Sequence, residues 1–245
     1  MIAEELGRAG IGLPDLVVGN WAVPTIIEFG SDAQRERFAR PTLRGEIAWC
    51  QLFSEPEAGS DLASLRTRAV RVDGGWSLTG QKVWTSMARD ADWAICLART
   101  SPDAANHKGI TYFLVDMKTP GIDVRPLREI TGDAIFNEVF LDDVFVPDDM
   151  VVGDVDGGWR LARATLSSER VAIASGSRLG HGLDELLTEM PPEPVLDDRL
   201  GELIARGQAA RAHAFLLTRS ATIAGGSSQV LRNIIAERLL GLPRD

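Results

Sequence analysis

The middle of the chain restricts the fold most, because it holds short strand-like segments separated by turn residues. The candidates are residues 47–53, 65–72, 76–79, 93–98, 111–115 and 138–146. Asp73-Gly74-Gly75 indicates a hairpin between the second and third of these segments, since glycine adopts a positive φ at little cost. Closely spaced strands joined by such turns are typical of an antiparallel sheet that forms a barrel or a sandwich.

A helical pattern precedes this stretch. Ser31 and Gln34 have the spacing of a capping box, in which a hydroxyl accepts from one free N–H of the first turn and an amide reaches back to another. They predict a helix over residues 32–43, with Phe38 and Leu43 on its inner side.

Helical patterns also follow the strand-rich stretch, over residues 159–175, 197–222 and 228–240. The last pattern ends at Gly241 and is followed by Pro243, the usual order at the C-terminus of a helix. The order helix, strand, helix predicts an α+β fold. The expected parts are a short N-terminal helical segment over residues 1–45, a β domain over 46–150 and a shortened C-terminal helical domain, an incomplete bundle, over 151–245.

Composition and charge exclude several classes of protein. The net charge is −9 and the isoelectric point is about 4.9, whereas a nucleic-acid-binding protein normally carries a basic patch. Two cysteines are too few for a disulfide scaffold, and no apolar run approaches the roughly 18 residues of a membrane span. The first residues lack the basic-then-apolar order of a signal peptide, so a cytoplasmic setting is expected. No phosphate-binding loop or zinc-ligand pattern is present, and no metal is expected.

Five short motifs are more informative in their order than singly. They are Gln-Leu-Phe-Ser-Glu-Pro-Glu-Ala-Gly-Ser-Asp at 51–61, Leu-Thr-Gly-Gln-Lys-Val-Trp-Thr-Ser at 78–86, Phe-Asn-Glu-Val-Phe at 136–140, Ser-Glu-Arg at 168–170 and Ile-Ala-Gly-Gly-Ser-Ser-Gln-Val at 223–230. In this order they resemble the acyl-CoA dehydrogenase family of FAD-dependent enzymes. The layout of that family, helices then a β domain then helices, agrees with the fold class predicted above.

The resemblance implies an FAD site built from three of these motifs. It places against the flavin ring the residues Leu52, Phe53, Ser54, Trp84, Thr85 and Ser86. The Ser86 hydroxyl is implied to lie near the reactive nitrogen of the flavin, and Ser60 near the cofactor phosphates and the acyl-CoA. A turn that opens a helix supplies the further cofactor contacts Ser227, Ser228 and Gln229.

Each of these segments also has an explanation that needs no ligand. The loop at 54–61 can be a plain connection after a strand. Trp84 can be a core aromatic residue of a strand. The serines at 227 and 228 can form a simple helix cap.

Glu169 is the candidate catalytic base. Trp159, Ala162, Leu166 and Ile173 share one face of its helix, so its carboxylate lies in an apolar stripe. A carboxylate there is costly without a chemical purpose or a partner. The alternative is a glutamate at the edge of the stripe, in a salt bridge to a neighbouring element.

The resemblance favours the catalytic role. Many members of the family place the base in the turn before the last helix, where this chain has Gly225. Other members place it on the first helix of the C-terminal domain, just before an arginine, as in Glu169-Arg170. Arg170 then matches the arginine on the CoA side.

The implied reaction is the α,β-dehydrogenation of an acyl-CoA thioester, a step of lipid metabolism. Glu169 removes the α-proton while the β-hydrogen leaves as a hydride to N5 of the flavin. The thioester carbonyl is polarised by a ribityl hydroxyl of FAD and by the backbone N–H of Gly225. An electron-transfer flavoprotein then reoxidises the flavin. The acyl group is not identified by the sequence.

The chain departs from the family pattern in length. Helices are expected to be missing at the N-terminus and between the helical stretches near the C-terminus. An Arg-x-x-Phe-Gly segment, which grips the FAD pyrophosphate across a subunit interface in many members, is absent. A second hypothesis is therefore a non-catalytic or partner-dependent subunit or fragment of an acyl-CoA dehydrogenase heteromer, and a homo- or hetero-oligomer is expected under either hypothesis.

Overall fold

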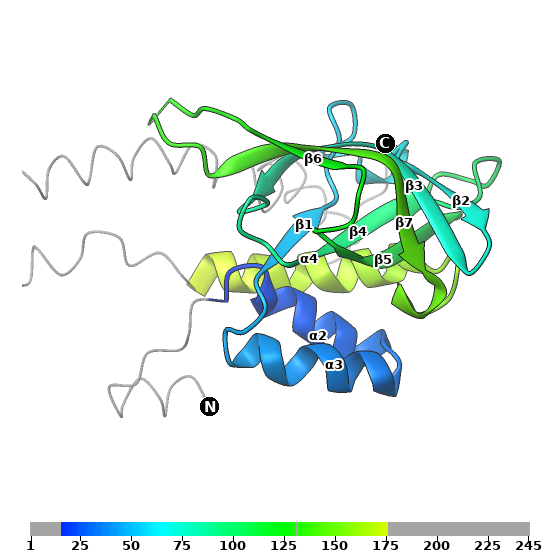
Figure 1. Cartoon of the computed structure of the whole chain (residues 1–245), viewed down its shortest axis with the longest axis horizontal. Helices are drawn as coiled ribbons and strands as arrows, with labels where there is room; N and C mark the ends of the chain where they lie inside the picture. Colours follow the sequence, from blue (N-terminus) through cyan, green and yellow to red (C-terminus); the bar gives the residue numbers. More distant parts are fainter. Residues whose placement is uncertain (1–15, 131, 176–245) are drawn as a thin grey trace, which may run out of the picture. The chain divides into compact units, whose positions relative to one another are not determined.

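The computed structural model describes residues 16–130 and 132–175, with side chains up to Arg170. Predicted helices over 197–222 and 228–240 lie outside these residues. The chain divides into two compact units, and the first, residues 1–129 and 134–169, contains the whole sheet and is described below. Figure 1 shows two N-terminal helices and the long helix α4 beside the strands.

The described elements follow the predicted order, which is helices, then strands, then a helix. They are the helices α2 (Gly19–Phe29), α3 (Asp32–Leu43) and α4 (Gly158–Ser175), the 3₁₀ turns η1 (Leu62–Ser64) and η2 (Asp148–Met150), and the strands β1 (Trp49–Leu52), β2 (Arg68–Val72), β3 (Gly75–Ser86), β4 (Trp93–Arg99), β5 (Ile110–Asp116), β6 (Ile122–Pro126), β7 (Phe136–Pro147) and β8 (Val151–Val152). The α+β class is confirmed.

Helix α3 begins as predicted. The N–H of Gln34 donates to Ser31 Oγ at 3.2 Å, and the N–H of Ser31 donates to Gln34 Oε1 at 3.0 Å. Phe38 is fully buried, as expected. The prediction for Leu43 is wrong, since its side chain is 57% exposed. It follows Phe38 by five residues, which turns it away from the buried face of a helix with 3.6 residues per turn.

Gln34 also ties α3 to the sheet. Its Nε2 donates to the carbonyl oxygens of Asp149 at 2.7 Å and Val151 at 2.8 Å. One buried amide therefore caps a helix and holds the segment that runs from η2 into β8.

The strands form one open sheet of eight strands in the order β6-β7-β3-β2-β4-β5-β8, with β1 paired to β4. The predicted hairpin is confirmed, since Val72 pairs with Gly75 and Gly74 has φ +72°. The expected barrel does not form within the described residues, because the strands at the two ends of the sheet, β6 and β8, do not pair with each other. The sheet is also not wholly antiparallel, as β1 and β2 each pair with β4 in parallel.

Helix α4 begins directly against the sheet. A Cβ on Gly158 would lie 2.7 Å from the carbonyl carbon of Thr111, so only glycine allows this approach. Further along α4, the Thr165 hydroxyl lies 2.8 Å from Thr25 Oγ1 of α2 and 3.2 Å from the hydroxyl of Tyr112 in β5. These buried contacts join α2, α4 and the sheet around one core.

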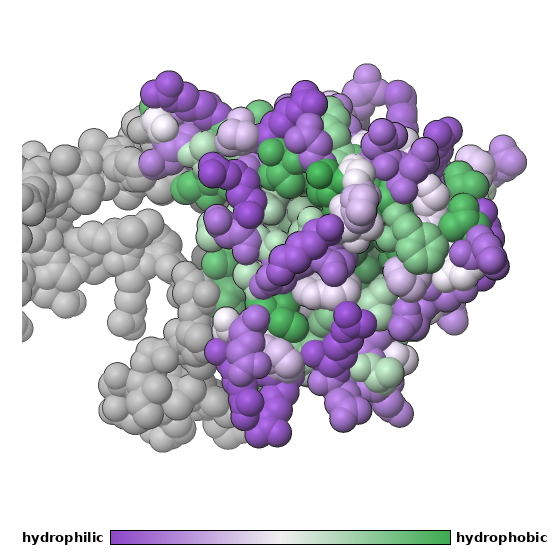
Figure 2. Space-filling model, in the orientation of Figure 1, coloured by the Kyte–Doolittle hydropathy of each residue, from purple (hydrophilic) through white to green (hydrophobic). Residues whose placement is uncertain are grey.

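Polar residues cover most of the face shown in Figure 2, with smaller apolar areas between them. Within residues 16–130 and 132–175, no helix is both long and apolar enough to cross a membrane.

Replacing Gln34 with alanine is expected to lower the free energy of unfolding by about 3 kcal/mol, because two carbonyl groups and the helix cap lose their partner. The matched control Ser31→Ala removes only the cap and is expected to cost about 1 kcal/mol. Urea denaturation measures both, and equal losses in the two variants would contradict the tie between α3 and the sheet.

Candidate active site

Two motifs that are far apart in the sequence meet at one place in the fold. The N–H of Val83 in β3 donates to the carbonyl oxygen of Ser54, just after β1, at 2.9 Å. This bond joins the segments that were predicted to face the flavin ring, Leu52 to Ser54 and Trp84 to Ser86, edge to edge.

A β-bulge shapes the end of β3. Lys82 pairs with Val139 of β7, but Thr85 pairs with Asn137, so β3 holds one extra residue. Trp84 lies within this bulge and has φ +60°, a backbone conformation that is uncommon for a bulky residue. The bulge turns its indole outward, where it is 62% exposed and meets only the edge of Phe136 among the aromatic rings described. The alternative of a core tryptophan is therefore wrong.

The predicted cofactor residues divide into two groups by exposure. Leu52, Phe53 and Thr85 have buried side chains, and the Phe53 ring meets Tyr112 edge-on at 5.9 Å inside the core. A ligand at the surface could therefore contact only the backbone of these three residues. The side chains that reach the surface are those of Ser54, Ser60, Trp84 and Ser86.

A buried ion pair supports these two segments from inside. Lys82 is fully buried, and its Nζ donates to Glu55 Oε1 at 2.8 Å, to the carbonyl of Leu97 at 2.8 Å and to the carbonyl of Phe53 at 3.1 Å. An ammonium group has three protons, so each has one acceptor. The pair thereby fixes the chain on both sides of Ser54.

The Glu55 carboxylate has further donors. It accepts from the N–H of Arg66 at 2.6 Å and the N–H of Thr67 at 2.9 Å, while the Glu55 backbone closes a turn with Ala58. Burial raises the pKa of Glu55, but the charge of Lys82 and these hydrogen bonds outweigh burial and hold the pKa below its ordinary value of 4.5. Sequence reasoning missed this pair, although Lys82 and Glu55 both stand inside the quoted motifs.

Glu169 lies on the inner face of α4, as its helical spacing predicted. It is 8% exposed, Ala162 on the same face is fully buried, and Leu166 packs against the core. Its Oε2 accepts a hydrogen bond of 3.1 Å from Nε2 of Gln51 in β1. The candidate base is thus hydrogen-bonded to the residue that directly precedes the segment predicted to face the flavin.

The structure describes only some of the remaining predicted site residues. Arg170 follows Glu169 on α4 and is half-buried. Gly225, Ser227, Ser228 and Gln229 lie outside the described residues. In the part of the chain that the structure describes, no group of three or more His, Cys, Asp or Glu side chains is arranged to hold a metal ion.

Comparison with known proteins identifies the family of the chain. The family model described as "Acyl-CoA dehydrogenase, middle domain" matches residues 50–144. Acyl-CoA dehydrogenase IpdE1 of Mycobacterium tuberculosis is 36% identical over 91% of this chain and 74% of its own length. This chain belongs to the acyl-CoA dehydrogenase family. Acyl-CoA dehydrogenase FadE34 of the same organism is 53% identical over the whole chain, which spans only 42% of that relative.

Two solved structures of this family are also similar. The structure titled "Tcur3481-Tcur3483 steroid ACAD" has a TM-score of 0.77 and 27% identity, over 98% of this chain and 80% of the solved one. The ChsE4-ChsE5 complex from Mycobacterium tuberculosis has a TM-score of 0.69 and 26% identity, over 100% and 81%.

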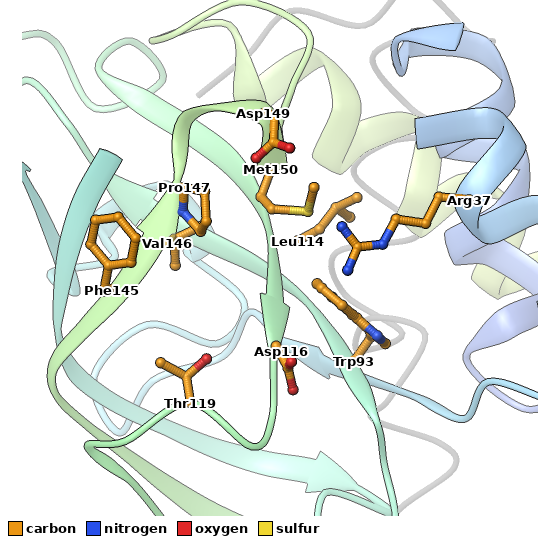
Figure 3. A pocket seen from close by; sticks show the side chains of 10 residues that line it. All are labelled: Arg37, Trp93, Leu114, Asp116, Thr119, Phe145, Val146, Pro147, Asp149 and Met150. Carbon is orange, nitrogen blue, oxygen red and sulfur yellow. The ribbon is translucent and has the colours of Figure 1, made fainter. Parts of the chain in front are cut away.

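One cavity of this acyl-CoA dehydrogenase family member lies apart from the predicted site. It has a volume of about 390 Å³ and contains none of the predicted site residues. Figure 3 shows the Arg37 guanidinium beside Trp93 at this cavity, and their separation is 4.8 Å.

The pH dependence of stability tests the Lys82–Glu55 pair. Because the pKa of Glu55 is lowered on folding, its stabilising contribution is full above pH 4.5 and is lost as the pH falls through the lower folded value. We expect Glu55→Gln to cost about 3 kcal/mol at pH 7, and less as the pH is lowered below 4.5. Urea denaturation over this pH range measures the difference, and a difference that stays constant with pH would contradict the assignment.

Proposed function

We propose that this chain binds FAD and catalyses the α,β-dehydrogenation of an acyl-CoA thioester. The observation that carries the proposal is the position of Glu169, whose buried carboxylate is bonded to Gln51 of β1 at 3.1 Å. The next residues of the same strand lead to Ser54, which is bonded to β3 beside Trp84. The proposed base, Glu169, and a surface made of serine hydroxyls and the Trp84 indole therefore both lie near the end of β1.

The exposed groups fit a flat cofactor with a polar edge. The Ser54 and Ser86 side chains are half-buried and the Trp84 indole is exposed, while Lys82 and Glu55 hold the backbone beneath them. We propose that FAD is held by these side chains, by Ser60, and by the motif with Ser227, Ser228 and Gln229. When bound, the flavin supplies the acceptor for the hydride.

Glu169, Gly225 and Arg170 are the groups that act on the substrate. Glu169 accepts the α-proton of the thioester, and its burial keeps water away from the carboxylate. The backbone N–H of Gly225 polarises the thioester oxygen and so stabilises the charge that forms there. Arg170 binds on the CoA side, where a guanidinium suits a phosphate.

For the acyl group we propose a steroid-type thioester, because the similar Tcur3481-Tcur3483 structure is a steroid ACAD. For the electron acceptor we propose an electron-transfer flavoprotein, as the family resemblance implies.

A second candidate is a subunit whose site is completed by a partner chain. It is supported by the similar ChsE4-ChsE5 structure, which is a complex. Such a chain would hold the Glu169 side of the site and receive further cofactor contacts from its partner.

An absorption spectrum of the purified chain, followed by anaerobic addition of straight-chain, branched and steroid acyl-CoA esters, tests the main proposal. A flavin band that is bleached by one class of ester supports dehydrogenation and identifies the substrate class. A colourless chain that takes up no added FAD contradicts the stand-alone enzyme, and recovery of colour with a co-expressed partner supports the second candidate.

Glu169→Gln is expected to slow bleaching by the active ester at least about 10²-fold, since an amide cannot accept the α-proton. The yellow colour is expected to remain, because Glu169 is not among the residues proposed to hold FAD. Stopped-flow absorbance measures the rate, and an unchanged rate would show that Glu169 is not the base.

A further inference from the structure

Gln51 joins three elements through its side chain. From β1 it reaches Trp21 of α2, whose Nε1–H donates to Gln51 Oε1 at 2.7 Å, and Glu169 of α4, whose Oε2 accepts from Gln51 Nε2 at 3.1 Å. Both bonds have ordinary lengths, and both link residues far apart in the sequence.

The chemistry of Trp21 determines which way the amide faces. An indole N–H can only donate, so the amide oxygen of Gln51 must face Trp21. The NH₂ group then has to face Glu169, where it can only donate. Trp21 therefore decides that the carboxylate of Glu169 meets a donor and not the oxygen of an amide.

We propose that Gln51 is a positioning residue for the catalytic base, with Trp21 holding Gln51 in its working orientation. This inference rests on the proposed function, since it assigns a partner to the proposed base. A donor at Oε2 stabilises the ionised carboxylate in a buried setting, where ionisation is otherwise costly. It also limits the rotamers of Glu169, so that the carboxylate stays in place to meet the α-proton.

The rest of the site shows why such a device is needed here. Glu169 is carried on a helix, whereas the flavin-facing residues are carried on β1 and β3. Gln51 belongs to β1 and directly precedes Leu52. Its bond to Glu169 therefore fixes the position of the base relative to the same strand that carries the cofactor surface.

Three substitutions separate the role of the bond from the role of the space it fills. Gln51→Met keeps the length of the side chain but removes the donor. Gln51→Glu keeps the shape but sets a carboxylate against Glu169. Trp21→Phe keeps an aromatic ring and removes only the indole N–H. The matched control is Gln81→Met, because Gln81 makes the same kind of bond to Glu138, at 3.2 Å, between β3 and β7.

We expect Gln51→Met to lower kcat for flavin bleaching by about tenfold, and Gln51→Glu by more, with KM and FAD content unchanged. Trp21→Phe is expected to lower kcat by a smaller factor and to have no further effect in the Gln51→Met background, since the two act through one bond. Gln81→Met is expected to leave kcat unchanged. An unchanged kcat in Gln51→Met, or a loss that is accompanied by loss of FAD, would overturn the positioning role.

A readout without cofactor tests the bridge itself. In the FAD-free chain, the melting temperatures of Gln51→Met, Glu169→Gln and the double variant are expected to be non-additive, whereas those of Gln81→Met and Glu169→Gln are expected to add. Additive effects at Gln51 and Glu169 would overturn the inference. If the wild-type chain bleaches and Gln51→Met bleaches equally fast, only this inference fails. If the wild-type chain does not bleach with any ester, the proposed function fails, and the role of Gln51 fails with it.

Discussion

The ion pair between Lys82 and Glu55 is the contact on which the predicted cofactor surface depends. It lies inside the sheet, where two charges are tolerated only because each has several hydrogen-bond partners. Through these partners one ammonium and one carboxylate fix the exit of β1, the turn after it, and the start of the segment that leads into β2. The Ser54 backbone at the surface lies between the two residues that this pair holds.

Trp84 has an unfavourable backbone conformation in β3. A bulky residue with positive φ costs free energy, and the structure accepts that cost at a place where an indole is turned outward. Such irregularities gather where a protein needs a side chain in a direction that a regular strand cannot provide.

Local signals in the sequence predicted the local parts of this structure. The capping box of Ser31 and the Asp73-Gly74 hairpin were correct because each depends on neighbouring residues alone. The burial of Glu169 was also predictable, since helical spacing fixes which residues share a face. The parallel pairing of β1 with β4, the strands β6 and β8, and the partners of Gln51 and Lys82 depend on residues far away in the chain. A polar residue within a strand motif gives no sign of what it will face, so these contacts could be found only in three dimensions.

The pairing of β1 with β4 has a consequence for how the chain matures. Trp49 to Leu52 is made before its neighbour in the sheet, the later stretch Trp93 to Cys96, and Gln51 meets Glu169 later still. Non-local pairings of this kind form slowly, because a long loop must close before any contact rewards the closure. The nascent chain therefore carries β1 unpaired until β4 has been made, and that strand is the point at which a chaperone, or an unwanted second strand, would meet it.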